Sequence, residues 1–129
     1  MLKQLLLREI EALGFTPLDL GTNTADSVDY PDYGHAVAKS IADGRAVLGV
    51  AICGSGIGIS IAANRHAGIR AALCSSGLAA ELARQHNDAN ILCLGARLIG
   101  DAEAKECVKR FLNTKFDGGR HTKRVEKLG

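Results

Sequence analysis

The amino-acid sequence predicts a doubly wound α/β sandwich, in which helices cover both faces of a parallel sheet. Two observations predict this fold class. Strand-like apolar runs alternate with helical patterns along the chain, an order that specifies parallel strands joined by crossover helices. The central run, residues 46–52, is continuously apolar, as expected for a strand that is covered on both faces.

The expected elements follow one another without a linker or an internal repeat. Leucines and isoleucines at helical spacing predict a first helix that stops at Gly14. Further helices are predicted at residues 33–42, 57–64, 78–86 and 102–112, and strands at 17–20, 46–52, 69–74 and 91–94. The polar residues 21–33 are expected to form a loop, and the segment from Asn113 lies outside the pattern. A doubly wound domain normally begins with a strand, whereas this chain begins with a helix.

Length and composition limit the class of protein. The chain has 129 residues, which is enough for one domain with a substantial core. Apolar residues make up 47 % of it, yet no segment is long and uncharged enough to span a membrane or to form a signal-peptide core. We therefore expect a cytoplasmic protein that binds no membrane. Aromatic residues make up only 4 %, which argues against stacking platforms for nucleic acid.

The four cysteines do not form a metal-binding or disulfide pattern. Their spacings match no zinc motif, and nothing indicates an oxidising compartment. Cys74, Cys93 and Cys107 lie in apolar or helical runs, so we expect them to be small buried residues. The formal net charge is only +2, but basic side chains gather between residues 120 and 127. Such a terminus is either a solvated tail or a segment that attracts nucleic acid.

Cys53 stands where the apolar run ends and a glycine-rich turn, GSGIG, begins. Ligands of open parallel sheets bind beyond the carboxyl ends of the strands, which is where the sequence places this thiol. Backbone amides in such a turn can converge on an anion, and a helix N-terminus favours the thiolate form of a nearby cysteine. The stretch predicts an anion site beside a reactive thiol. The alternative is a cysteine that only fills a strand end.

Three common glycine motifs do not match this turn. The dinucleotide fingerprint GxGxxG requires a glycine where Ile59 stands. It also requires an acidic residue about 20 positions further on, where the stretch RAALCSS contains none. The phosphate loop GxxxxGK[ST] has no lysine here, and the nucleophile elbow GxSxG fails because Ser55 lies in GSG. A second candidate is His86, at a helix end just before a strand, where a capping role is the alternative to catalysis.

Five sequence blocks occur in the order VDYPDY, ICGSGIGISIAAN, GIRAALC, RQHNDANILCLGAR and GGRHTKRVE. With these blocks and their spacing the whole chain resembles the ribose-5-phosphate isomerase B family, which is related to galactose- and allose-6-phosphate isomerases. The resemblance implies a Rossmann-like three-layer sandwich. It also implies an aldose–ketose isomerase of the pentose phosphate pathway, which interconverts ribose 5-phosphate and ribulose 5-phosphate with no metal and no cofactor.

The resemblance also implies how the chain assembles. Residues 1–129 form one sugar-phosphate isomerase domain, and the segment 113–129 reaches a neighbouring subunit. A homodimer or a homotetramer is therefore expected. The basic end of the chain is then better explained as a clamp for the substrate's phosphate than as an arm that binds nucleic acid.

Each matching residue carries an implied role. Cys53 matches the base that moves a proton between adjacent carbons through an enediolate, with the hydroxyl of Ser55 beside it. His86 matches the acid/base that opens the furanose ring. The backbone amides of residues 54–58 match the loop that holds the enediolate oxygens, while two residues contact the sugar and two arginines bind phosphate. The expected substrate-binding residues are Tyr30, Gly54, Gly56, Ile57, Gly58, Asn87, Arg120 and Arg124.

The sequence departs from the family pattern at its start. The family begins with a strand and an Asp-His pair, whereas this chain starts inside the helix that follows. We therefore expect either a natural start further upstream or a truncated form, with unpaired edges on the strands at 17–20 and 46–52. Near Leu78 the family's usual aromatic residue is also missing. The alternatives are an impaired or inactive sugar-phosphate-binding paralogue, an isomerase of allose or galactose 6-phosphate, and a generic nucleotide-binding or receiver-like module.

Overall fold

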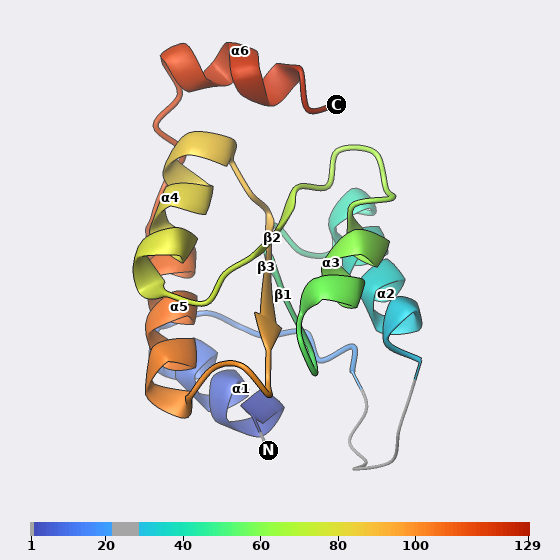
Figure 1. Cartoon of the computed structure of the whole chain (residues 1–129), viewed down its shortest axis with the longest axis vertical. Helices are drawn as coiled ribbons and strands as arrows, with labels where there is room; N and C mark the ends of the chain where they lie inside the picture. The colour runs from blue at the N-terminus through green and yellow to red at the C-terminus, as the bar shows by residue number, and fades with distance from the viewer. Residues whose placement is uncertain (1, 22–28) are drawn as a thin grey trace.

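Three parallel strands form the centre of the protein (Figure 1). The structure is a computed structural model that describes residues 2–21 and 29–129. The strands are β1 (Gly49–Cys53), β2 (Ala71–Leu73) and β3 (Ile91–Gly95), in the order β1-β3-β2. All residues of the central strand β3 are buried. A helix connects β1 to β2 and another connects β2 to β3, so both connections are crossovers, as the alternating sequence pattern predicts.

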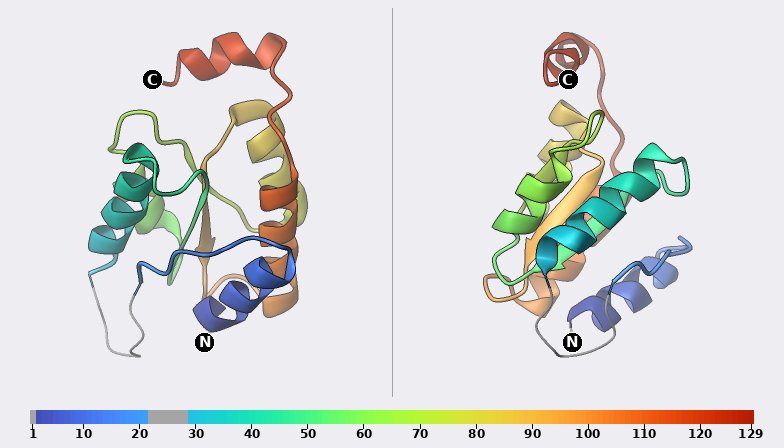
Figure 2. Two further views of the ribbon diagram at one scale, coloured as in Figure 1. Left: turned by 180° about the vertical axis from the view of Figure 1, so that it is seen from behind. Right: turned by 90° about the vertical axis from the view of Figure 1, so that its right-hand side faces the viewer.

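Helices cover both faces of this sheet. In the described residues they are α1 (Leu2–Ala12), α2 (Tyr30–Ala42), α3 (Ile57–Ala63), α4 (Gly77–Asn87), α5 (Asp101–Asn113) and α6 (Arg120–Glu126). Figures 1 and 2 show α2 and α3 on one face and α1, α4 and α5 on the other, with α6 lying across one end. The predicted doubly wound sandwich is confirmed.

The side chains of β3 divide the core into two parts, because successive residues of a strand point to opposite faces. Leu92 and Leu94 pack with Phe111 and other side chains on the face that carries α1, α4 and α5. Ile91 and Cys93 pack on the face that carries α2 and α3. A strand that is buried on both faces must be apolar throughout, which explains the sequence ILCLG.

The register of the sheet determines which residues meet at its edges. β1 pairs with β3 from Gly49 opposite Ile91 to Cys53 opposite Gly95. Both strands therefore end at the same edge, which lies near α1 in Figure 1, and both begin at the edge near α6. Residues that follow a strand and residues that precede one consequently lie at opposite edges of the molecule.

One predicted strand is wrong. Residues 17–20 belong to no helix or strand, because a strand needs a hydrogen-bonded neighbour and β1 pairs only with β3 among the described residues. Within the described part of the chain, the edge of β1 that faces away from β3 has no paired strand, as expected. The predicted loop 21–33 is partly wrong, because α2 already begins at Tyr30. Pro31 lies in the first turn of this helix, where the N–H that proline lacks would have no acceptor within the helix. Residues 22–28 of that loop lie outside the described residues.

The remaining predicted elements are confirmed with shifted boundaries. β1 begins later than expected, at Gly49, and β2 is shorter, at Ala71–Leu73. The segment from Asn113 onward, which the strand–helix pattern did not cover, contains the additional helix α6. Within the part of the chain that the structure describes, no helix is long and apolar enough to cross a membrane.

Replacing Phe111 by alanine tests the packing of this core. The ring is fully buried, and the guanidinium carbon of Arg84 lies 5.8 Å from its centroid. We expect Phe111→Ala to lower the free energy of unfolding by about 3–5 kcal/mol, measured by urea denaturation. The control Val47→Ala, at a side chain that is 85 % exposed, should change it by less than about 0.5 kcal/mol. A loss below about 1 kcal/mol for Phe111→Ala would contradict this packing.

Candidate active site

The thiol of Cys53 lies at the carboxyl end of β1, directly before the turn that leads into α3. The side chain is partly buried and forms no disulfide. Gly56 caps α3 in the left-handed region with φ 78°, a conformation that favours glycine. In this conformation the N–H of Gly56 donates a hydrogen bond to Cys53 Sγ at 3.2 Å. An N–H donor at a helix N-terminus stabilises negative charge on the sulfur.

The turn offers further amide groups beside the thiol. The N–H of Ile57 donates to Ser55 Oγ at 3.2 Å, so this donor is already used within the loop. The N–H groups of Gly54, Ser55 and Gly58 have no hydrogen-bond partner among the described residues. Gly58 lies in the first turn of α3, where amides have no acceptor within the helix, and Gly54 and Ser55 precede that helix. These three N–H groups are available to a bound anion. A cradle made of all the amides from 54 to 58 remains a prediction.

A shallow cavity of about 370 Å³ opens at this turn. It is lined by Tyr30, Cys53, Gly54, Ser55, Gly58, Arg97 and Leu98. The ring of Tyr30 packs against Gly58, where a Cβ atom would collide with it. The absence of a side chain at Gly58 therefore lets Tyr30 reach the cavity from the first turn of α2.

Arg97 is the charged member of this cavity that sequence analysis did not single out. Its side chain lies over the loop, with Nε 3.4 Å from the place of a Cβ on Gly54. The available signal was topological: Cys53 ends β1 and Arg97 lies two residues after the end of β3, so both lie at one sheet edge. A guanidinium beside unpartnered amides is suited to bind a phosphate or an enediolate oxygen.

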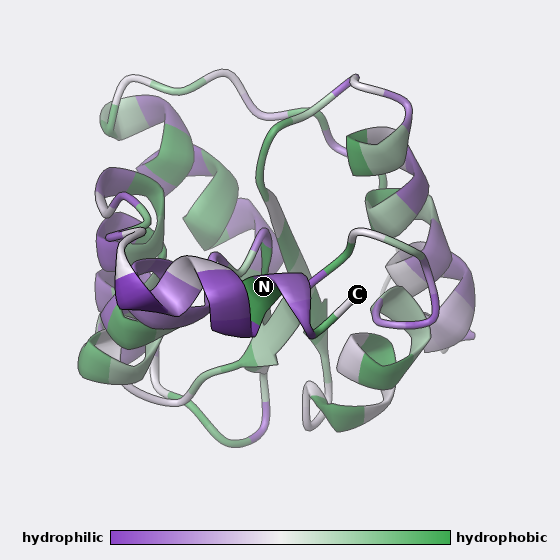
Figure 3. Ribbon diagram, turned by 90° about the horizontal axis from the view of Figure 1, so that it is seen from above, coloured by the Kyte–Doolittle hydropathy of each residue, from purple (hydrophilic) through white to green (hydrophobic). Residues whose placement is uncertain are grey.

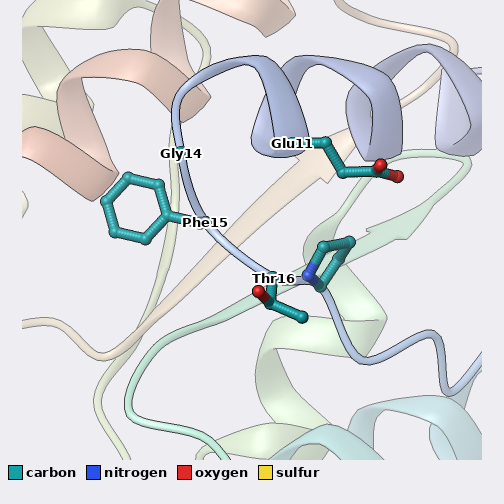
Figure 4. A pocket seen from close by; sticks show the side chains of 5 residues that line it. Glu11, Gly14, Phe15 and Thr16 are labelled. Atoms are coloured by element: carbon teal, nitrogen blue, oxygen red, sulfur yellow. The ribbon is translucent and has the colours of Figure 1, made fainter.

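A larger cavity, of about 490 Å³, lies where α1 ends. Its lining residues are Glu11, Gly14, Phe15, Thr16 and Pro17 (Figure 4). Figure 4 shows Glu11 and Phe15 pointing in different directions. Glu11 is the one titratable side chain in this lining, so acid–base chemistry would lack a second group here. The candidate active site is therefore the smaller cavity at Cys53.

His86 and Asn87 do not join Cys53 within one chain. They end α4 just before β3 begins, so they lie at the edge of the sheet where strands start. Cys53 lies at the edge where strands end. With a rise of about 3.3 Å per residue, these edges are on the order of 15 Å apart. The sequence already indicated that the two residues lie at opposite edges, because His86 stands before a predicted strand and Cys53 stands at the end of one.

His86 instead belongs to a second group, formed with the C-terminal helix α6. Its ring stacks on that of His121, with centroids 4.4 Å apart and an interplanar angle of 13°. Partial desolvation lowers the pKa of His121, and the charges of His86, Arg120 and Arg124 lower it further, which favours the neutral imidazole. α6 holds Arg120 and Arg124, as their spacing predicted, and none of its residues is buried. Figure 3 shows the strongly hydrophilic character of this helix.

The same group contains donor atoms that a metal ion could use. Ligand atoms of His86, Asp117 and His121 lie within 4.8 Å of one another. Imidazole and carboxylate groups are ligands that zinc accepts. The positive charges of Arg120 and Arg124, which lower the pKa of His121, also disfavour a metal cation beside it. The group is thus better suited to an anion, and we assign no metal to it.

Comparisons with known proteins show the family to which the chain belongs. The family model described as "Ribose/Galactose Isomerase" matches residues 1–128. The chain belongs to this family. It is 44 % identical over 128 residues to the ribose-5-phosphate isomerase B of Escherichia coli (strain K12), an alignment that covers 99 % of this chain and 86 % of that protein.

Solved structures of other family members have the same fold. The ribose-5-phosphate isomerase B of Clostridium thermocellum superposes with a TM-score of 0.96 at 46 % identity, over 99 % of this chain and 86 % of that one. The Thermotoga maritima protein superposes with a TM-score of 0.95 at 50 % identity, over 98 % of this chain and 88 % of that one. The Ribose/Galactose Isomerase fold is therefore shared over nearly the whole chain.

The other three cysteines of this family member are chemically different from Cys53. All of them are buried, as predicted. Burial raises the pKa of Cys74 to about 11 and that of Cys107 to about 11. Burial, with the nearby Cys74 and Cys53, raises the pKa of Cys93 to about 12. Since the thiolate is the reactive form, these three thiols are protected from electrophiles at neutral pH.

Alkylation with iodoacetamide tests this difference. A thiol with a pKa of about 11 is ionised to only about one part in a thousand at pH 8, so only Cys53 should react quickly in the folded protein. Peptide mass spectrometry should find the label on Cys53 within minutes, and on all four cysteines after denaturation in urea. Rapid labelling of Cys74, Cys93 or Cys107 in the folded state would contradict the site.

Proposed function

We propose that the protein is an aldose–ketose isomerase that interconverts ribose 5-phosphate and ribulose 5-phosphate. The observation that carries the proposal is the partly exposed thiol of Cys53, which accepts the Gly56 N–H in a cavity with unpartnered amides and a guanidinium. Relatives named ribose-5-phosphate isomerase B, at 44 % identity over nearly the whole chain, support the choice of reaction.

In the proposed mechanism the thiolate of Cys53 removes the proton from C2 of the open aldose. The electron pair moves into a C1–C2 double bond, and negative charge develops on the oxygens of the enediolate. A proton passes from the C2 hydroxyl to the C1 oxygen, and the thiol then returns its own proton to C1, which completes the ketose without an external oxidant or reductant. A base near its operating pKa contributes about 10²–10⁴-fold to such a step. The free amides of Gly54, Ser55 and Gly58 and the Arg97 guanidinium stabilise the developing charge.

The proposal includes a homodimer, or a homotetramer built from it, whose sites combine residues of two chains. His86, Asn87, Arg120 and Arg124 lie at the far sheet edge, where they cannot serve Cys53 of their own chain. Supplied by a second copy, His86 would open the sugar ring, Asn87 would contact the sugar, and the two arginines would bind its phosphate. The segment 113–129 would then be the part of the domain that reaches the neighbouring subunit.

Exposed large apolar side chains support this assembly. Five of them lie on α3, β2 and α4, and we propose that they form one surface: Ile57 (51 % exposed), Ile61 (52 %), Leu73 (42 %), Leu78 (58 %) and Leu82 (37 %). Ile57 adjoins the Cys53 turn, and Leu82 lies one helical turn before His86. A two-fold axis through this surface would reverse the order of these elements in the second copy. Each His86 group would then face a Cys53 turn.

The location of the protein follows from the same proposal. The four cysteines form no disulfide, which fits a reducing compartment such as the cytoplasm. Sugar phosphates of the pentose phosphate pathway are available there. Whether the protein converts five- or six-carbon sugar phosphates is tested by the activity assay described next.

Replacing Cys53 by alanine tests the reaction. We expect kcat for ribose 5-phosphate to fall by about 10³-fold in a coupled assay, with an unchanged melting temperature, because the variant lacks the base. Wild-type activity on allose 6-phosphate, measured in parallel, defines the substrate class. Retention of full activity by Cys53→Ala would refute the mechanism. A wild-type protein that binds the sugar phosphate in calorimetry but never converts it would support the inactive paralogue.

Mixing two inactive variants tests the shared site. In a heterodimer of Cys53→Ala and His86→Ala chains, one site carries both changes and the other site carries neither. Random mixing should restore about a quarter of wild-type activity, since half of the dimers contain one intact site of two. Each variant refolded alone is the control. If native mass spectrometry shows heterodimers but no activity returns, His86 and Cys53 do not act across the interface.

A further inference from the structure

The turn after β3 holds residues 53–56, which we call the catalytic loop, by its backbone. The N–H of Ala96 donates to the carbonyl oxygen of Cys53 at 2.8 Å, and the N–H of Arg97 donates to that of Gly54 at 2.9 Å. The N–H of Leu98 donates to the carbonyl oxygen of Gly95 at 2.9 Å and closes the turn. These bonds continue the pairing of β3 with β1 beyond the ends of both strands.

Gly95 is the point where the loop and the end of β3 come closest. A Cβ atom on this buried residue would collide with the carbonyl oxygen of Ser55 and lie 2.5 Å from its carbonyl carbon and 2.9 Å from its Cα. All three atoms belong to the backbone, so no side-chain rotation can relieve the clash. Gly95 does not have a positive φ, so another residue could adopt its conformation. The requirement for glycine here is purely one of space.

Gly56, on the other side of the contact, also lies close to the backbone of β3. A Cβ atom on Gly56 would lie 2.9 Å from the carbonyl carbon of Leu94 and 3.0 Å from the nitrogen of Gly95. The loop from Cys53 to Gly56 therefore rests directly on the backbone of β3. Because Gly56 supplies the N–H that binds Cys53 Sγ, a shift of this contact moves both the thiol and its donor.

We propose that Gly95 is a positioning residue of the active site. Its missing side chain lets the Ser55 backbone pack onto the end of β3, and this packing aligns the Cys53 thiol with the Gly56 N–H and the free amides. The inference rests on the proposed isomerase for its catalytic consequence. Its structural consequence, the alignment of Cys53 with Gly56, does not depend on the substrate. A displacement of about 1 Å in such a site can lower the rate about 100-fold.

The test compares Gly95→Ala with the matched control Gly100→Ala. Gly100 lies in the connection from β3 to α5, five residues after Gly95. It has a φ of −79° and nothing within 4 Å of the place of its Cβ. For Gly95→Ala we expect kcat to fall about 100-fold while KM changes by less than about threefold, because the proposed phosphate contacts lie elsewhere. The control should retain both values.

A second readout separates this inference from the proposed function. The rate of Cys53 alkylation at neutral pH should fall at least about fivefold in Gly95→Ala and stay unchanged in Gly100→Ala, because only the first loses the Gly56 donor. This holds whichever sugar the protein converts, and even if it converts none. Wild-type alkylation and wild-type kcat in a folded Gly95→Ala variant would overturn the inference, as would equal losses in the control.

If Gly95→Ala does not fold, a measurement on the wild-type protein tests whether the turn after β3 holds the catalytic loop. The amide hydrogens of Ala96 and Arg97 belong to exposed residues, yet they are bonded to the carbonyls of Cys53 and Gly54. Hydrogen exchange followed by NMR should show them protected nearly as strongly as the amides of β3. Exchange at the rate of an open loop would show that the turn does not hold the catalytic loop, and would overturn the inference.

Discussion

The parallel pairing of β1 with β3 is the constraint on which the rest of the site depends. The register places Cys53 opposite Gly95, so the residues that leave each strand meet at one edge. A turn with a thiol and free amides comes from β1, and a turn with a guanidinium comes from β3. Because the two turns are bonded backbone to backbone, their geometry is set by the sheet rather than by flexible side chains.

The four thiols of this chain lie in different environments, and only that of Cys53 is not fully buried. Cys74, Cys93 and Cys107 fill the core, where burial raises the pKa of each thiol and keeps it neutral. Cys53 is only partly buried and accepts an N–H from the start of a helix. The different environment of Cys53 therefore follows from its position at a strand end, and its reactivity remains a prediction.

Sequence patterns predicted the sandwich, the place of Cys53 and the helical spacing of Arg120 and Arg124, because each depends on local order along the chain. The strand at 17–20 was wrong because a strand exists only with a neighbour, and periodicity does not reveal whether one is present. Gly95 and Arg97 could not be recognised either. Their importance comes from contacts with the loop after β1, which lies far away in the sequence.

The distribution of charge and apolar side chains gives a physical reason for the proposed sharing of a site between two copies. Arg120 and Arg124 lie on a helix without a buried residue, at the edge opposite the thiol. A small sugar phosphate cannot reach both edges of one chain, whereas a two-fold relation would bring them together. The side chains that would mediate it, from Ile57 to Leu82, are large, apolar and exposed in one chain. Burial of this surface would stabilise the pair at about 25 cal/mol per Å² of apolar area, and the same contact would complete both sites.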